Sequence, residues 1–251
     1  MRIVSIGDSF TEGVGDRAGT GEPIGWAGRV AKGLAAAHPD EPVWYANVAV
    51  RGRLIADIAG AQLDAALALD PPPTHVTFNG GGNDMLRPGY SDERMITLFR
   101  RVLEACAEAG VHLVILSGPD PSDGLPIGDR MRTLSNRLCE IVETLIEGRS
   151  GVTFVDNFRD IESRKPGYWS RDRLHLNPLG HERVASRVLT AMGVPTPAPE
   201  LPVPKRRERG FLSGVGFWIV YVLPWMGRRL LRRSSGDKRQ PRFPDWVLVS
   251  A

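Results

Sequence analysis

The 251-residue chain contains little cysteine and has no long apolar run at its start. Two cysteines, Cys106 and Cys139, are too few to form a disulfide framework. The opening residues Met1–Ile6 already have the pattern of a strand, so a charged and then apolar leader is not expected, and the predicted location is the cytoplasm. Hydrophobic residues make up 42% and charged residues 24% of the chain, which excludes a largely disordered, collagen-like or coiled-coil protein.

Basic residues are unevenly distributed. Residues 201–251 hold 11 Lys and Arg against 3 Asp and Glu, whereas the first 200 residues hold 21 against 26. The positive charge therefore belongs to the C-terminal segment, and we expect no nucleic-acid-binding body. A basic segment of this kind favours an acidic partner or a membrane surface.

Short apolar runs alternate with longer amphipathic stretches over the first 195 residues. The expected strands are Arg2–Ile6, Val43–Val48, His75–Phe78, His112–Ser117 and Val152–Asp156. The expected helices are Trp26–Ala37, Leu54–Leu69, Asp92–Glu108, Asp129–Glu147 and Gly180–Met192. This alternation predicts an α/β protein with three α/β/α layers around a five-stranded parallel sheet. Ligands of such sheets bind at the carboxyl ends of the strands, so chemistry is expected just after each strand.

The chain is predicted to have three parts. Residues 1–193 form the α/β domain, residues 194–209 a proline-rich basic linker, and residues 210–251 an apolar and basic tail. Residues 210–227 are uncharged, and 18 residues are at the lower limit for a spanning helix. Because Pro224 and two glycines weaken such a span, we favour a helix that packs on the domain or lies on an anionic membrane.

Ser9 directly follows the first expected strand, in the run Gly7-Asp8-Ser9. The glycine permits a tight turn, which would expose the Ser9 hydroxyl at the edge of the sheet where ligands bind. A nucleophile fits this position. A serine that only caps a helix fits it too.

Asp172 and His175 lie between the last expected strand and the last expected helix. A carboxylate three residues before a histidine can accept a hydrogen bond from the imidazole Nδ1, which leaves Nε2 free to take a proton from a serine. A surface aspartate and a histidine that starts a helix are the alternative. A metal site that includes His181 is a further option, but no metal-ligand spacing supports it, and no metal or cofactor is predicted.

Two further elements follow strands and offer N–H groups. Asn83 comes after three consecutive glycines, and Gly52 follows the second expected strand with a bare backbone N–H. A glycine-rich turn with no ligand is the alternative reading. A phosphate-binding loop is not supported, because the ending Gly-Lys-Ser/Thr is missing. Together with Ser9, His175 and Asp172, these groups match what acyl transfer requires.

The sequence resembles the SGNH (GDSL-type) hydrolases, a family of serine esterases and lipases. The resemblance covers about residues 1–192 and rests on four blocks in the family's order: Gly7-Asp8-Ser9, the turn at Gly52, Gly82-Asn83-Asp84, and Asp172-x-x-His175. It implies a flavodoxin-like fold with Ser9 as nucleophile, His175 as base and Asp172 as its orienting acid. It also implies an oxyanion hole formed by the N–H groups of Ser9 and Gly52 and the side chain of Asn83.

These observations predict a serine hydrolase that cleaves a small-molecule carboxylic ester through an acyl-enzyme, without a cofactor. An acyltransferase with the same triad, and a binding module that has kept the fold but lost turnover, are the alternatives. The complete set of Ser9, Asp172 and His175 argues against the binding module. The C-terminal tail is the part of the chain expected to touch a membrane.

Overall fold

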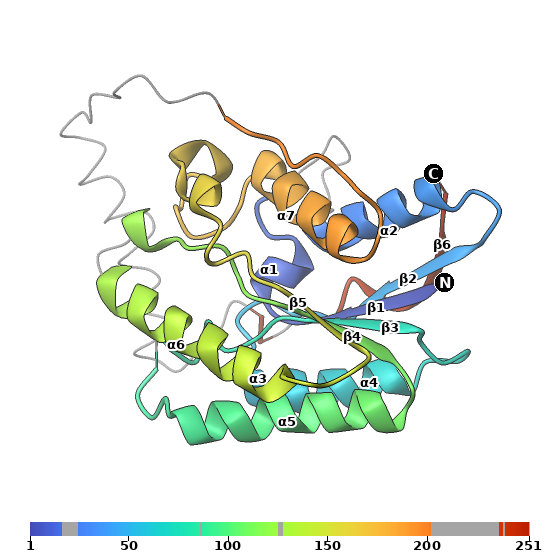
Figure 1. The fold of residues 1–251 in the computed structure, drawn as a ribbon, viewed down its shortest axis with the longest axis horizontal. Helices are drawn as coiled ribbons and strands as arrows, with labels where there is room; N and C mark the ends of the chain where they lie inside the picture. Colours follow the sequence, from blue (N-terminus) through green and yellow to red (C-terminus); the bar gives the residue numbers. More distant parts are fainter. Residues whose placement is uncertain (17–24, 86, 125–127, 202–235, 238, 251) are drawn as a thin grey trace.

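The computed structural model describes residues 1–16, 25–85, 87–124, 128–201, 236–237 and 239–250. A central sheet is covered by helices on both faces (Figure 1). The strands are β1 (Arg2–Ile6), β2 (Val43–Asn47), β3 (His75–Phe78), β4 (His112–Leu116), β5 (Val152–Val155) and β6 (Phe243–Val249). The helices are α1 (Ser9–Glu12), α2 (Gly25–Ala37), α3 (Ile55–Asp57), α4 (Leu63–Leu67), α5 (Asp92–Glu108), α6 (Gly128–Ile146) and α7 (Pro178–Ala191), with single helical turns at Ile58–Gln62, Ser122–Gly124, Ile161–Arg164 and Pro166–Tyr168.

The strand order is β5-β4-β3-β1-β2-β6, and the first five strands along the chain run parallel. Read from β2, this is the doubly wound order 2-1-3-4-5 of flavodoxin-like folds, which confirms the predicted three-layer architecture. The winding changes direction between β1 and β3. Ligands of such sheets bind beside this switch point, at the carboxyl ends of the strands.

The sheet has six strands, so the prediction of five is wrong by one. The additional strand, β6, pairs antiparallel with β2, with Trp44 opposite Leu248 and Tyr45 opposite Val247. It lies in the segment that the sequence analysis assigns to the tail. An edge strand with Pro244 near its start carries a weak sequence signal, and its partner lies about 200 residues earlier in the chain.

Each face of the sheet has its own apolar core. Helices α2 and α7 pack on one face, around Trp26, Leu34 and Val188, all of which are fully buried. The stretch α3 to α5 packs on the other face, around Ile58 and Phe78, and α6 adds Val142. Figure 1 shows these two helical layers on either side of the sheet. The three-layer arrangement leaves the ends of the strands as the place where loops from both halves of the chain meet.

The helix predicted at Leu54–Leu69 is broken rather than continuous. It consists of α3, a turn at Ile58–Gln62 and α4, with non-helical backbone angles at Gly60 (φ −103°, ψ −106°). Glycine adopts such angles without a side-chain clash. Beyond the kink, the amide of Gln62 bonds both backbone groups of Gly7, through Gly7 N–H to Oε1 (2.8 Å) and Nε2–H to Gly7 O (3.0 Å). The break thus helps to fix the turn that precedes Ser9.

The chain after α7 is fastened to the domain as far as the structure describes it. Pro199 O accepts hydrogen bonds from Tyr168 and Arg183, and Leu201 N–H donates to Glu162. The apolar stretch at 211–226 and the basic run at 228–233 lie outside the described residues. None of the helices in the described part of the chain is long and apolar enough to cross a membrane. The division into domain, linker and tail stays a prediction.

Candidate active site

Ser9 is the first residue of α1, immediately beyond the end of β1. Asp8, not Ser9, caps this helix, since Asp8 Oδ1 accepts a hydrogen bond from Phe10 N–H at 3.1 Å. The half-buried Ser9 side chain lines a cavity of about 160 Å³. The turn needs a glycine before it, because a Cβ at Gly7 would lie 2.4 Å from Thr11 Oγ1. The cap role that competed with the nucleophile role is therefore taken by the neighbouring residue.

Asp172 and His175 form a hydrogen-bonded pair in the loop between the last strand of the parallel sheet and α7. The distance from Asp172 Oδ2 to His175 Nδ1 is 2.6 Å. Asp172 Oδ1 accepts from the N–H groups of Leu174 and His175, both at 3.0 Å, and these bonds fold the loop back on itself. Burial opposes the charged form of Asp172, but the hydrogen bonds from His175 and the backbone outweigh it and lower its pKa.

His175 and Ser9 line the same cavity, although 166 positions separate them in the sequence. The loop after α1 packs directly against the histidine loop, since a Cβ at Gly15 would lie 2.0 Å from Leu176 O. His175 also acts electrostatically on the buried carboxyl of Asp8. The sheet edge thus brings the Ser9 hydroxyl and the His175 imidazole to one cavity, with the Asp172 carboxylate bonded to the imidazole.

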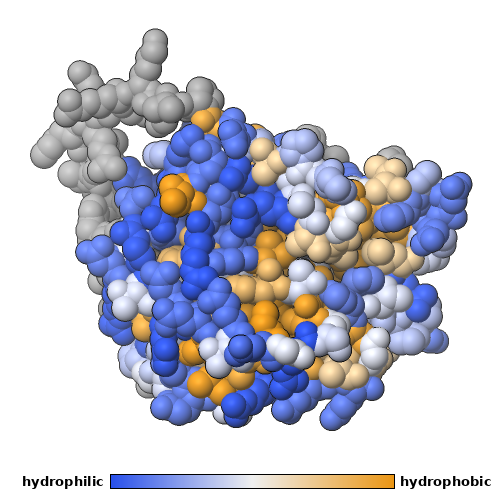
Figure 2. All heavy atoms as spheres, viewed as in Figure 1, coloured by the Kyte–Doolittle hydropathy of each residue, from blue (hydrophilic) through white to orange (hydrophobic). Residues whose placement is uncertain are grey.

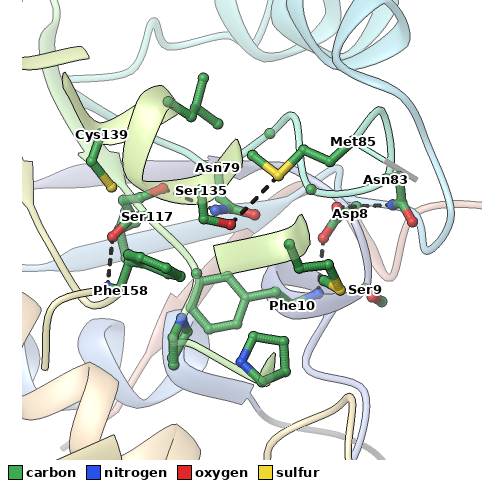
Figure 3. Close-up of a pocket in the computed structure, with 18 of the residues that line it drawn as sticks. Asp8, Ser9, Phe10, Asn79, Asn83, Met85, Ser117, Ser135, Cys139 and Phe158 are labelled. Atoms are coloured by element: carbon green, nitrogen blue, oxygen red, sulfur yellow. Dashed lines mark hydrogen bonds between the residues drawn. The ribbon is translucent and has the colours of Figure 1, made fainter. Parts of the chain in front are cut away.

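Asn83 connects three loops at this edge. It lines the cavity, and its Nδ2 donates to Asp8 Oδ2 at 2.9 Å (Figure 3). The same Nδ2 donates to Arg53 O at 3.1 Å. Asp8 is the neighbour of Ser9, and Arg53 is the neighbour of Gly52. The positive φ of Gly52 (77°) favours glycine in this turn, although Gly52 is not among the residues that line the cavity. The three N–H donors implied by the resemblance therefore belong to loops that Asn83 joins.

Asp8 is a buried carboxyl beside the expected nucleophile. Burial raises its pKa to about 6, against the hydrogen bond from Phe10 N–H and the nearby His175, which both lower it. Its bond with Asn83 means that both amide protons of Asn83 have acceptors in the protein. An oxyanion that binds Asn83 would have to share or replace one of these bonds.

Two supporting residues, Gln62 and Glu12, do not appear among the predicted site residues. Glu12 of α1 accepts Arg51 N–H at 2.6 Å and Arg51 Nε at 2.8 Å, which fastens the Gly52 turn to the helix that starts with Ser9. Gln62 holds the turn at Gly7. Both contacts join distant parts of the chain, and only the position of Glu12 within the Ser9 motif hints at such a role.

His181, named in the metal option, bonds backbone groups rather than the Asp172–His175 pair. Its Nδ1 accepts Trp26 N–H at 3.1 Å and its Nε2 bonds Val14 O at 3.2 Å. Burial lowers its pKa to about 4, so the ring is neutral and acts as a cross-link between backbone segments. Within the described residues, no three His, Cys, Asp or Glu side chains are grouped so that they could hold a metal ion.

A model of the GDSL-like lipase/acylhydrolase family matches residues 5–183, most of the chain. No curated protein matches the sequence. Among solved structures, the acetylxylan esterase Axe2 of Geobacillus stearothermophilus superposes with a TM-score of 0.60 at 20% identity, over 76% of this chain and 94% of that one. The lipase Lip_vut3 from a goat rumen metagenome gives 0.59 at 20% identity, over 76% and 97%.

The esterase EstA of Pseudoalteromonas sp., solved with monoethylphosphonate as inhibitor, gives a TM-score of 0.56 at 20% identity, over 76% of this chain and 96% of that one. Identities of this size establish a shared fold. They say nothing about which ester this chain cleaves.

Proposed function

Because the chain belongs to the GDSL-like lipase/acylhydrolase family and is a carboxylic ester hydrolase, we propose that Ser9, His175 and Asp172 form its catalytic triad and that the reaction passes through an acyl-enzyme. The observation that carries this proposal is the 2.6 Å bond between Asp172 and His175, in a histidine that lines one cavity with Ser9.

His175 supplies the base that a serine hydroxyl needs near neutral pH. As Ser9 Oγ attacks the ester carbonyl, its proton passes to His175 Nε2, and Asp172 stabilises the imidazolium through Nδ1–H. The tetrahedral intermediate collapses, the C–O bond to the alcohol breaks, and His175 returns the proton to the alcohol. Water then attacks the acyl-enzyme by the same route and releases the acid and free Ser9.

The oxyanion is stabilised by the N–H groups of Ser9 and Gly52 and by the amide of Asn83. Donors that are already oriented need little reorganisation when charge develops on the carbonyl oxygen. Asn83 must share or give up one of its bonds, to Asp8 or to Arg53 O, to act as such a donor. The network Asp8–Asn83–Arg53 supports this assignment because it holds the three donor-bearing loops together. The Glu12–Arg51 pair serves the same purpose for the Gly52 turn.

The decisive experiment is active-site labelling with a fluorophosphonate. The wild-type chain is expected to be labelled once, at Ser9 by peptide mapping, and Ser9→Ala to take up no label and to lose turnover of p-nitrophenyl acetate. Ser150→Ala is the matched control, because Ser150 is exposed in the turn between α6 and β5 and does not line the cavity. Labelling at another residue, or turnover that survives in Ser9→Ala, would contradict the proposal.

A further inference from the structure

The cavity beside Ser9 extends far beyond the groups that the reaction needs. Figure 3 shows Asp8, Ser9 and Asn83 on one side of it and Ser117, Cys139 and Phe158 on the other, with Met85 and Ser135 between them. It passes from the carboxyl ends of β1, β3 and β4 to the inner side of α6, which contributes Met131, Ser135, Leu138, Cys139 and Val142 to its wall. The inner end lies inside the domain.

The inner part of the cavity is lined mainly by apolar side chains. Phe99, Ile115, Val142 and Phe158 are all nearly fully buried. Among the described lining residues, Asp8 and His175 are the only ones with a carboxyl or imidazole group, and both belong to the catalytic end.

The polar groups along the inner wall are already bonded within the protein. Ser117 Oγ donates to Asp156 and accepts Phe158 N–H, and Asn79 Nδ2 donates to Leu116 O. The hydroxyl of Ser135 faces the sulfur of Met85 at 3.5 Å. A polar ligand would have to break these bonds, whereas an apolar chain leaves them in place.

Figure 2 shows mostly hydrophilic residues over the outer surface of the face in view, with apolar residues gathered in a band between the helical layers.

Size limits what the cavity can hold. The cavity volume of about 160 Å³ is close to that of an apolar protein cavity that binds benzene, a molecule of about six carbons.

We propose that this cavity is the acyl-binding site and that it selects esters of linear acyl chains of about six carbons. The inference rests on the proposed function, which places the ester carbonyl at Ser9 and one arm of the ester in the adjoining cavity. The alcohol then lies toward the opening of the site. Each methylene buried in the cavity is expected to raise kcat/KM about four-fold until the inner end is reached.

The test is a series of p-nitrophenyl esters from acetyl to dodecanoyl, each used below its critical micelle concentration. We expect kcat/KM to rise to a maximum at hexanoyl and to fall about ten-fold or more at decanoyl. Ser135→Phe narrows the cavity at its middle, so it should move the maximum to acetyl or butyryl. Thr144→Phe on the exposed side of the same helix should leave the profile unchanged.

A second variant and a binding assay cover the case in which Ser135→Phe does not fold. Val142→Ala enlarges the inner part of the cavity and should move the maximum toward octanoyl. Independently of turnover, 1-hexanol should raise the Tm of the wild-type chain more than 1-propanol or 1-decanol at equal concentration.

The outcomes separate the two proposals. Turnover that is flat with chain length, or that rises to dodecanoyl and ignores both variants, would overturn the acyl assignment and leave the triad proposal intact. Turnover that does not depend on Ser9, with the hexanol effect present, would reject the triad and leave the cavity as a site for a six-carbon chain. Absence of the hexanol effect together with a flat profile would remove the cavity from any role in binding.

Discussion

Asn83 is the side chain that joins the separate parts of the proposed machinery. It bonds Asp8 and the carbonyl of Arg53 while lining the cavity beside Ser9. Since an oxyanion donor acts mainly in the transition state, Asn83→Ala should lower kcat by about 10²–10³ and change KM little. Steady-state kinetics with p-nitrophenyl acetate measure this. A change confined to KM would remove Asn83 from the oxyanion hole.

The buried carboxyl of Asp8 makes the stability of the protein depend on pH. Its pKa is raised from 3.8 to about 6, mainly by burial, so the native state holds a proton that the unfolded chain has lost between these values. This group therefore contributes stability that is present below about pH 4 and is lost as pH rises through 6. Above pH 6 the native protein contains a buried anion that is stabilised by its bonds to Phe10 and Asn83.

Replacing the carboxyl by an amide should reverse this balance. Asp8→Asn is expected to raise the free energy of unfolding by up to about 2 kcal/mol at pH 8 and to lose that advantage at pH 4. At pH 8 its kcat should fall about ten-fold or more, because an amide N–H toward Asn83 no longer orients it. Urea unfolding at both pH values, with parallel kinetics, makes the comparison. If Asp8→Asn lowered the free energy of unfolding by the same amount at both pH values, burial of the charged Asp8 carboxylate would not destabilise the wild-type protein.

At the scale of elements, periodicity predicted the regular structure well and its exceptions poorly. The five parallel strands agree with prediction to within a residue at each end, because buried strands are short apolar runs between turn residues. The break at Gly60 was not predicted. A lone glycine in a helical pattern is usually tolerated, and here the kink serves a contact between Gln62 and Gly7 that no local pattern encodes.

For the candidate site, the sequence could predict where the side chains lie but not what supports them. Ser9, Asn83 and His175 line one cavity and Asp172 bonds His175, as their positions after strands predict, and their catalytic roles stay a prediction. The supporting contacts of Glu12 and Gln62 could not be predicted. They depend on which loops meet in space, and this is decided by packing across the sheet rather than by spacing along the chain.

The link between α1 and the Gly52 turn can be tested by removing Glu12. Glu12→Ala deletes the acceptor for Arg51 N–H, so the Gly52 N–H should lose its orientation and kcat should fall about ten- to a hundred-fold. Asp64→Ala is the control, because it breaks an exposed ion pair with Arg101 on α5, and such pairs contribute little to stability. If both variants kept the wild-type kcat, the Glu12–Arg51 pair would have no part in positioning Gly52.

At the scale of the whole molecule, buried titratable groups far apart in the fold act together on stability. His75 packs against His112 where β3 and β4 begin, at the end of the sheet opposite the candidate active site, and the two ring centroids are 5.4 Å apart. Burial lowers the pKa of His75 to about 4, and the charges of His112 and of the N-terminus act in the same direction. His181, under α2, has a pKa lowered to about 4 by burial. Both lie below the ordinary value of 6.5, so the unfolded chain binds two protons that the native state does not bind between pH 6.5 and 4.

Acid should therefore destabilise the protein, with Asp8 and Asp84 offsetting part of the loss. Two histidines favour the unfolded state on acidification, whereas the carboxyls of Asp8 and Asp84, whose pKa values are both raised by burial, favour the native state. After a discount for the partial exposure of His75 and for these two carboxyls, we expect the free energy of unfolding to fall by about 1–2 kcal/mol from pH 7 to pH 5. His75→Gln removes one of the two titrations and should abolish most of this loss, whereas His38→Gln, at an exposed position just after α2, should keep it. Urea unfolding of the three chains at both pH values measures the difference, and an unchanged acid loss in His75→Gln would mean that the paired histidines at β3 and β4 are not its source.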